Sequence, residues 1–366
     1  MAMKATELSN ETRAAARTNQ AFEGRAEALR REIKLHCYRM LGSLHESEDA
    51  VQETFLRAWR SFDNFEEGSF RAWIYRIATN VCLNSLASRK HVQRLLPDQL
   101  GPAAVEIQDG TPATEVAWLE PYPDLDLERI ADDAPNPEAR YTSREAVQLA
   151  FIAAIQELPQ RQRAALLLCD VLGWTAAEAG TLLGGSTASV NSALQRAREM
   201  LAKRYPTGRP LEASPPSLAQ QKLLDRYLKA WEGHDLDSFV ALLKEDATAT
   251  MPPWREWYVG REAIGSLFTI ACRICGGFRL VPTAANAQPA FAVYERSGTD
   301  TGWAARCIHV LTLQDDKIST LTVFVPPTGP QLFPAFGLPF ILPNAASPEH
   351  QEQARAGPVE GYHSWR

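Results

Sequence analysis

The sequence lacks several features that would assign it to a membrane or to the outside of the cell. No run of about 18 apolar residues occurs in its 366 residues, so no membrane-spanning helix is predicted. The first twenty residues lack the apolar centre of a secretory signal peptide. The six cysteines are scattered through a long chain, unlike the disulfide framework of a small secreted domain. We therefore expect a protein of the reducing cytoplasm.

The chain also lacks an excess of positive charge, but its charges are unevenly distributed. The formal net charge is −6. Between Pro97 and Ala139, eleven acidic residues and seven prolines accompany a single basic residue, Arg129, which predicts an extended and negatively charged linker. Helical segments with basic clusters lie on both sides of this linker. Because contact with nucleic acid depends on local charge, the acidic total does not exclude a nucleic-acid-binding protein.

Changes in composition divide the chain into segments. Hydrophobic residues make up 45% of the sequence, enough to build several cores, and the length suggests two or three domains. The segments are an N-terminal tail at 1–21, a helical module at 22–96, the acidic linker at 97–140, a second helical module at 141–205, a proline-rich joint at 206–217, a third module at 218–325 and a proline-rich C-terminal tail at 326–366.

The third module changes from helical to alternating patterns. Helical segments come first, with a short strand among them, and four segments of alternating apolar residues fill the stretch from Phe278 to Val325. Helices followed by an antiparallel sheet predict an α+β domain. The C-terminal tail is apolar, but its prolines exclude a regular helix or a central strand. Its apolar side chains need a groove, either on the third module itself or shared with the first module or the linker.

Two predictions concern the first helical module. Ser47 is followed by Glu48 and Asp49, and this order predicts the start of a helix, where acidic residues favour the helix dipole. In the next long helix, Trp73 and Ile77 lie on one apolar stripe, so we expect Trp73 in the core rather than at the surface.

The stretch from Leu172 to Leu201 predicts two short helices joined by a tight turn. Thr175 and Glu178 form the pattern of a capping box, and Gly184 makes the turn. Small and polar residues dominate the outer faces of the second helix, and its Asn, Gln and Arg side chains match the hydrogen-bonding groups of base edges. This is the pattern of a helix-turn-helix that reads the major groove of DNA. A plain helical hairpin with a solvated face is the alternative.

Two motifs occur in the order typical of one family. "EDAVQETFLRAWRSFDNF" and "SFRAWIYRIATNVCLNSLASRK" closely resemble region 2 of bacterial sigma factors, and "LPQRQRAALLLCDVLGWTAAEAGTLLGGSTASVNSALQRAREML" closely resembles region 4. Together they resemble the extracytoplasmic-function group of the sigma-70 family, which keeps only these two regions. The third module resembles the SnoaL-like domains, and the composite resembles the actinobacterial SigG type of that group.

The resemblance implies a multidomain fold and a function. Two all-α sigma domains, a region 2 helical bundle and a region 4 helix-turn-helix, precede an α+β SnoaL-like domain with a cone fold. The implied protein is an alternative sigma factor without enzymatic activity. It binds core RNA polymerase and promoter DNA and initiates transcription, and its C-terminal domain regulates this activity. In this family the linker threads the RNA path of the polymerase; from composition alone, an inert tether is the alternative.

The resemblance also implies site residues. The polymerase-binding set is Asp49, Ala50, Val51, Gln52, Glu53 and Phe55, of which we expect Phe55 to be an exposed aromatic. The minus-ten set, which includes the loop that captures a flipped base, is Asn64, Phe65, Gly68, Ser69, Arg76, Asn80, Asn84 and Lys90. The minus-thirty-five set is Ser186, Thr187, Ser189, Asn191, Ser192, Gln195, Arg196 and Arg198.

The third module carries side chains that allow other chemistry. Its aromatic residues can line an apolar pocket for a small-molecule ligand: Tyr227, Trp231, Trp254, Trp257, Tyr258 and Tyr294. Asp235, Asp237 and Asp246 are candidate acids, but the first two lie where a helix start favours acids, so capping is the favoured role for them.

Four cysteine and histidine side chains of the third module can share a zinc or redox site. Cys272 and Cys275 share a helix face, and Cys307 and His309 share a strand face. Their spacing is not that of a standard zinc site, so no metal, cofactor or catalytic residue is predicted.

A second function class competes with the sigma factor. A cone-fold enzyme or sensor of small molecules, fused to a DNA-binding regulator, would also combine a helix-turn-helix with the third module. Such a regulator has no use for the segment "DAVQETFLRAW" and the aromatic and basic helix that follows it. The sequence therefore favours the sigma factor.

Overall fold

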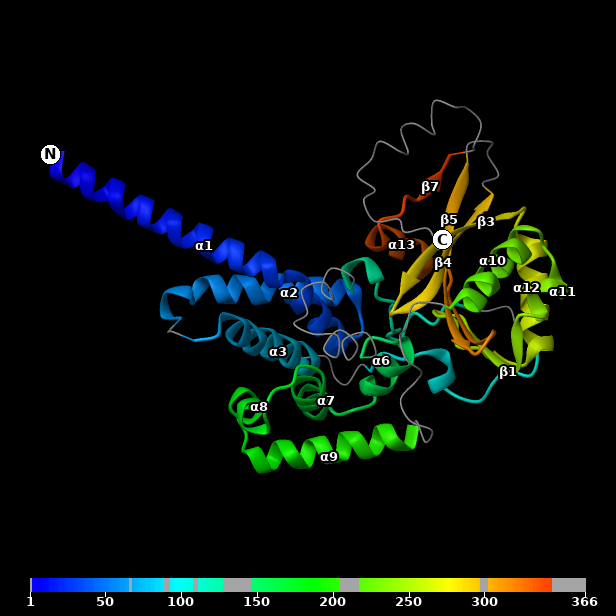
Figure 1. The fold of residues 1–366 in the computed structure, drawn as a ribbon, viewed down its shortest axis with the longest axis horizontal. Coiled ribbons are helices and arrows are strands. Elements are labelled where there is room, and N and C mark those ends of the chain that lie inside the picture. The colour runs from blue at the N-terminus through cyan, green and yellow to red at the C-terminus, as the bar shows by residue number, and fades with distance from the viewer. Residues whose placement is uncertain are drawn as a thin grey trace. The chain divides into compact units, whose positions relative to one another are not determined.

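The computed structural model describes residues 2–65, 68–88, 93–107, 111–127, 146–204, 217–296 and 302–343 (Figure 1). Contacts divide the chain into two compact units. The helical unit comprises Met1–Leu95 and Ala117–Pro210, and the sheet unit comprises Leu96–Val116 and Leu211–Arg366. The chain therefore has two segments in each unit and crosses between the units three times. Two crossings lie in or next to the predicted acidic linker, and the third lies in the predicted joint at 206–217. None of the helices within these ranges is long and apolar enough to cross a membrane.

Three helices form the first part of the helical unit. They are α1 (Ala2–Leu41), α2 (Leu44–Arg60) and α3 (Phe70–Ser88), and each packs against the other two. The predicted helix start at Ser47 is wrong by one turn. Ser43 caps α2 by accepting a hydrogen bond from the Glu46 amide, while Ser47 is buried within the helix. The predicted tail at 1–21 belongs to α1, although the side chains of most of its residues lie outside the described set.

The second part of the helical unit contains the predicted helix-turn-helix. Its helices are α6 (Leu149–Gln156), α7 (Gln160–Leu166), α8 (Ala176–Leu183) and α9 (Thr187–Arg204), with a π-helical turn at Leu167–Val171. The capping box at Thr175 and Glu178 is confirmed, and so is the turn, where Gly184 adopts φ 63°. A left-handed residue ends α8 at little cost only when it is glycine. Helix α9 packs against α7 and α8.

The sheet unit has the predicted order of helices and strands. Its main helices are α10 (Leu218–Glu232), α11 (Leu236–Val240) and α12 (Arg261–Ile274). The strands are β1 (Leu243–Thr250), β2 (Trp257–Val259), β3 (Phe278–Ala285), β4 (Gln288–Arg296), β5 (Trp303–Gln314) and β6 (Lys317–Phe324). They lie in the order β2-β1-β6-β5-β4-β3, with only the β1–β6 pair parallel. The four alternating segments are thus confirmed as neighbouring strands.

Both faces of the sheet are covered, and the C-terminal tail covers one of them. Alternate residues such as Phe291 and Val293 belong to the core beneath α10 and α12. Tyr294, which follows Val293, packs edge-on against Phe333 of the tail on the other face. The tail forms helix α13 (Thr328–Leu332), a 3-10 turn and strand β7 (Ile341–Leu342), which pairs with β5. The groove that the tail needs is therefore on the sheet unit itself.

The prediction that prolines exclude regular structure from the tail is wrong for two short stretches. Helix α13 contains Pro330, and the 3-10 turn that follows contains Pro334 near its start. Proline is tolerated in the first turn of a helix because the amide group it lacks has no partner there.

The acidic linker is not a free tether where the structure describes it. In the sheet unit, the Ala104 amide donates to the Trp257 carbonyl group, and the Trp257 indole Nε1 donates to the Gly101 carbonyl oxygen at 2.8 Å. The Ala113 amide donates to the Pro253 carbonyl group in the same unit. These bonds fasten both ends of the stretch 101–113 to the unit that contains the third module.

The next stretch of the linker belongs to the helical unit. The Glu120 carboxylate accepts hydrogen bonds from the Leu44 amide at 2.7 Å and the Ser43 hydroxyl at 3.1 Å, at the N-terminus of α2. The Tyr38 hydroxyl donates to the Glu120 carbonyl group, and Leu119 is completely buried. An anion at the positive end of α2 is favourable, so this part of the linker stabilises the start of that helix.

Candidate nucleic-acid interface

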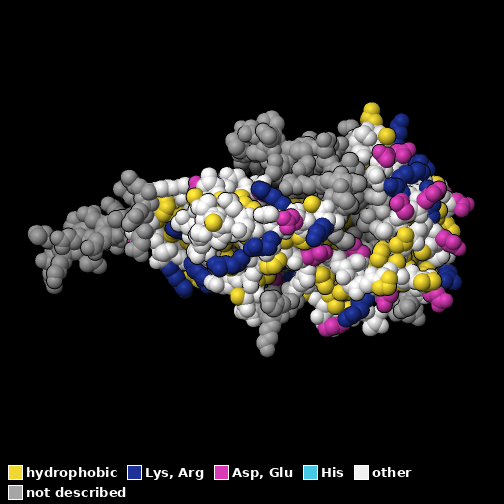
Figure 2. All heavy atoms as spheres, turned by 90° about the horizontal axis from the view of Figure 1, so that it is seen from below, with side chains coloured by type: hydrophobic (Ala, Val, Ile, Leu, Met, Phe, Trp, Pro, Cys, Tyr) yellow, Lys and Arg dark blue, Asp and Glu magenta, His cyan; other side chains and the backbone are white. Residues whose placement is uncertain are grey.

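Helix α9 presents a polar face that is free to contact DNA. Its apolar side chains Val190, Leu194 and Ala197 are buried against the helical unit, as the spacing predicts. All eight side chains of the predicted minus-thirty-five set are exposed. Figure 2 views the molecule from the side on which α9 lies in Figure 1, and Lys and Arg side chains form a band on this face. The face therefore combines positive charge with side chains that can read base edges.

Four of these side chains have partners within the protein. Ser186 and Ser189 bond locally at the start of α9. The Gln195 amide donates to Glu199, one turn along α9. Arg198 makes a two-pronged ion pair with Asp170 in the π-helical turn. The Arg198 contact has no sequence signal, because Asp170 lies 28 residues before its partner.

The predicted minus-ten residues lie around the start and along one side of α3. Gly68, Ser69, Arg76, Asn80 and Asn84 are exposed. The side chain of Asn64 and the whole of Lys90 lie outside the described residues. The structure thus brings these five members of the set to the surface.

Phe65 is half-buried in an aromatic cluster at the start of α3. Its ring lies 4.9 Å from that of Trp73 and 5.7 Å from that of Phe70, measured between centroids. The Arg25 guanidinium stacks over Phe70 with its carbon 4.5 Å from the ring centroid. This packing holds Phe65 against the start of α3, next to the loop where the resemblance places base capture.

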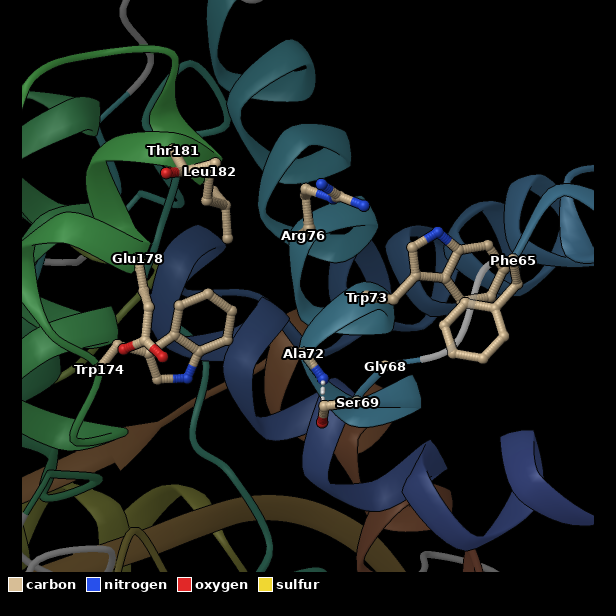
Figure 3. A pocket seen from close by; sticks show the side chains of 10 residues that line it. All are labelled: Phe65, Gly68, Ser69, Ala72, Trp73, Arg76, Trp174, Glu178, Thr181 and Leu182. Atoms are coloured by element: carbon tan, nitrogen blue, oxygen red, sulfur yellow. Dashed lines mark hydrogen bonds between the residues drawn. The ribbon is translucent and has the colours of Figure 1, made fainter.

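The minus-ten residues and α8 line a common pocket of about 570 Å³ within the helical unit. In Figure 3, Phe65, Trp73 and Arg76 approach it from one side, and Trp174 and Glu178 approach it from the other. The prediction that Trp73 belongs to the core is wrong in part, since its ring is only half-buried and forms part of this wall. Aromatic rings beside a guanidinium suit the stacking of unpaired bases.

Helix α2 exposes a different aromatic residue from the one expected. Phe55 is 9% exposed and belongs to the core with Ala50 and Val51, so the expectation of an exposed aromatic at Phe55 is wrong. The exposed apolar side chains are instead Leu56 at 42% and Trp59 at 51%.

The exposed apolar side chains of α2 lie on the same helix as two exposed polar residues of the predicted set. Asp49 and Gln52 are exposed, and Glu53 is half-buried and pairs with Arg57. An exposed tryptophan rimmed by polar groups is typical of a protein-binding surface.

Two buried arginines join the two parts of the helical unit. Arg39 of α1 donates from Nε to the Ala146 carbonyl oxygen at 3.0 Å. Arg163 of α7 donates to the Met40 carbonyl oxygen and, at 2.6 Å, to the Gln156 side-chain oxygen. Burial lowers the pKa of each guanidinium to about 10, so both remain charged at neutral pH.

The aromatic residues of the third module form a core more than a pocket wall. Tyr227, Trp231 and Tyr258 are buried members of one apolar cluster, against which Trp254 packs. Tyr294 packs against the tail instead, and the Trp257 indole donates a hydrogen bond to Gly101 of the linker. The candidate acid Asp235 is confirmed as a cap, because its carboxylate accepts from the Ser238 amide, which lowers its pKa.

The cysteine and histidine side chains of the third module do not form a metal site. His309 is buried. Its Nδ1 is hydrogen-bonded to the Tyr227 hydroxyl at 2.7 Å, and its Nε2 lies 3.3 Å from the Cys307 sulfur. Cys275 contacts the Glu295 carboxylate instead. Within the described ranges, no group of three or more His, Cys, Asp or Glu side chains is arranged to hold a metal ion. Burial lowers the pKa of His309 to about 3, so the imidazole is neutral.

Comparisons with known proteins agree with this architecture. Family models match in chain order: Sigma-70 region 2 at residues 26–92, Sigma-70 region 4 at 148–201 and the SnoaL-like domain at 224–321. The crystal structure of the extracytoplasmic function sigma factor SigJ of Mycobacterium tuberculosis has the same fold. It aligns with a TM-score of 0.56 and 22% identity over 86% of this chain and 98% of that one.

Sequence relatives specify the family. The ECF RNA polymerase sigma factor SigW of Bacillus subtilis is 30% identical over 50% of this chain and 88% of its own length. The ECF RNA polymerase sigma factor SigG of Mycobacterium tuberculosis is 44% identical over 322 residues, which are 87% of this chain and 84% of that protein. The chain therefore belongs to the ECF sigma factors of RNA polymerase, with sigma regions 2 and 4 followed by a SnoaL-like domain.

Proposed function

We propose that this sigma factor uses three surfaces of its helical unit in transcription initiation. The exposed side of α2 binds core RNA polymerase, the start of α3 holds the unpaired minus-ten strand, and α9 reads the minus-thirty-five element. The observation that carries the proposal concerns the two faces of α9. Val190, Leu194 and Ala197 are buried on one face, while all eight predicted reading residues are exposed. On this proposal, the protein acts in the cytoplasm.

The test is run-off transcription with purified core polymerase on a library of genomic fragments. We expect the full chain to give discrete transcripts that require both promoter elements. Core polymerase that gives the same transcripts without the chain would overturn the proposal.

We propose that the SnoaL-like domain regulates transcription and is not an enzyme. Its aromatic side chains are packed together, and its buried His309 is hydrogen-bonded to a tyrosine that is itself completely buried. The second candidate, a cone-fold enzyme or ligand sensor fused to a DNA-binding regulator, does not account for the exposed Leu56 and Trp59 on α2.

The proposed regulation acts through the acidic linker. The stretch 101–113 is hydrogen-bonded to the sheet unit, and Arg255 pairs there with Glu115. A linker that enters the RNA path of the polymerase must first break these contacts. The SnoaL-like domain therefore restrains the linker and lowers the rate of initiation.

Substitutions at the linker contact test this regulation in the full chain. The double change Trp257→Phe and Arg255→Ala removes one hydrogen bond and one ion pair and keeps an aromatic ring, so we expect more run-off transcript. Lys244→Ala, which removes an exposed bond to Gln314, serves as the control. Truncation after Pro206 should act in the same direction as the double change. Equal output from all four proteins would contradict the proposal.

A further inference from the structure

The ion pair between Asp170 and Arg198 connects the recognition helix to its support. Arg198 Nε donates to one carboxylate oxygen at 3.0 Å, and a terminal guanidinium nitrogen donates to the other at 2.6 Å. The Asp170 side chain is 14% exposed and that of Arg198 is 60% exposed. The pair thus lies at the edge of the protein interior, where a two-pronged contact restricts direction as well as distance.

Asp170 belongs to an element that cannot easily move. It lies in the π-helical turn Leu167–Val171, which continues α7, and the first two residues of that turn are buried. Helix α7 makes extensive contacts with α9. Arg198 lies three turns into α9, seven residues after Asn191 and three after Gln195, so the two reading residues are close to it along the helix.

Other restraints on α9 are a cap and apolar packing. Ser186 caps its start by accepting from the Ser189 amide, and the buried residues Val190, Leu194 and Ala197 form its apolar face. An apolar face fixes the distance between helices better than it fixes rotation about the helix axis. Reading a base edge requires side chains to be held within about 0.5 Å and 10–20° of the productive geometry.

We infer that Asp170 is a positioning residue for recognition of the minus-thirty-five element, acting through Arg198. The ion pair sets the rotation of α9 and engages the Arg198 guanidinium, so that Arg198 does not serve as a DNA contact. This inference rests on the proposed reading role of α9. It removes Arg198 from the minus-thirty-five set and adds Asp170, which touches no DNA.

The experiment uses the holoenzyme formed from the full chain. The probe is the genomic promoter fragment that gives the strongest run-off transcript, together with the same fragment with a scrambled minus-thirty-five element. The ratio of the two affinities measures reading of that element. The variants are Asp170→Asn, Arg198→Gln, their double mutant and the charge-swapped pair Asp170→Arg with Arg198→Asp. The control is Glu27→Gln, which makes the same charge change as Asp170→Asn in an exposed ion pair of α1.

We expect each single substitution to lower the ratio of the two affinities about fivefold. The double mutant should have the same ratio as the single variants, because each substitution removes the same interaction. The charge-swapped pair should recover most of the wild-type ratio of affinities. The dependence of affinity on salt should be unchanged in Arg198→Gln, since no phosphate contact is lost. Glu27→Gln should behave as the wild type.

Three results would overturn the inference. The first is an unchanged ratio in Asp170→Asn. The second is failure of the swapped pair to recover while the single variants still form holoenzyme. The third is a salt slope that falls by about one in Arg198→Gln, which would show that Arg198 binds a phosphate. A wild-type ratio of one would instead contradict the reading role of α9, and the inference would fall with it.

Discussion

The guanidinium of Arg163 in region 4 donates a hydrogen bond to the carbonyl oxygen of Met40 at the end of α1 in region 2. The same guanidinium donates to the side-chain oxygen of Gln156 and to the carbonyl oxygens of Gln156 and Leu158. These acceptors are neutral, so the buried cation is balanced by dipoles. The contact joins the two sigma regions within one unit.

Replacing Arg163 by methionine should therefore destabilise the helical unit. The substitution leaves several buried carbonyl groups without their donor, and we expect a loss of about 3 kcal/mol in the free energy of unfolding. Urea denaturation of the full chain measures it. Arg161→Met is the matched control, because Arg161 is exposed and, among the residues that the structure describes, donates to the Leu183 carbonyl oxygen. Equal losses in the two variants would contradict this account of the contact.

The exposed side of α2 should affect holoenzyme formation without affecting stability. We expect Trp59→Ala, and the double change Asp49→Ala with Gln52→Ala, to weaken binding to purified core polymerase in a pull-down while the melting temperature stays unchanged. Phe55→Ala should do the reverse and cost about 3–5 kcal/mol of stability, because Phe55 is in the core. Unchanged polymerase affinity in both surface variants would place the interface elsewhere.

Arg196 should contribute directly to promoter binding. Its side chain is exposed on α9, and Arg196→Ala should cost about 1–3 kcal/mol on the cognate element if it contacts a base. If it contacts a phosphate, the loss should be the same for all sequences and the salt slope should fall by about one. Holoenzyme binding to intact and scrambled fragments at several salt concentrations separates these outcomes. No change at fixed salt would mean that the recognition helix has been misplaced.

The sheet unit should lose stability in mild acid because of His309. Burial lowers its pKa from 6.5 to about 3, so below pH 6.5 the unfolded chain takes up a proton that the folded unit excludes. Stability is therefore present above pH 6.5 and falls as the pH drops towards 3. At pH 5 the loss from this group is about 2 kcal/mol.

Urea unfolding at pH 7 and pH 5 tests the contribution of His309. In His309→Gln, the difference between the two pH values should shrink by about that amount, even if the variant is less stable throughout. A difference of the same size in wild type and variant would exclude His309 as its source.

Two phenylalanines of the tail offer a matched comparison. Phe333 is completely buried against Tyr294, whereas Phe340 is 54% exposed. We expect Phe333→Ala to lower the stability of the sheet unit by about 3–5 kcal/mol and Phe340→Ala to have little effect. Thermal unfolding of the full chain would show this. Similar melting temperatures for the two variants would mean that packing of the tail on the sheet does not stabilise this unit.

Local patterns predicted most of the fold and part of the site. Three of these features depend only on residues close together in sequence, so local patterns predict them: the capping box at Thr175, the turn at Gly184 and the alternating strands. The apolar stripe of α2 was less clear. Trp59 follows Phe55 by four residues, which is the spacing of an apolar stripe, but Ala58 is the residue that is buried, and the Trp59 indole is half exposed.

Contacts between distant segments could not be predicted. Asp170 and Arg198 are ordinary charged residues in sequence, and only the packing of α7 on α9 brings them together. Likewise, the acidic and proline-rich composition of the linker predicted an extended chain, but nothing in it specified that Glu120 would complete the N-terminus of α2.

The double passage of the chain through the sheet unit has a consequence for how its state depends on protein concentration. Residues 96–116 lie between regions 2 and 4 in sequence, yet they fold with the C-terminal domain. The release and recapture proposed for this stretch would be unimolecular events, so their equilibrium would be independent of protein concentration. A cell that makes few copies of this sigma factor would hold the same fraction of them in the captured state as a cell that makes many.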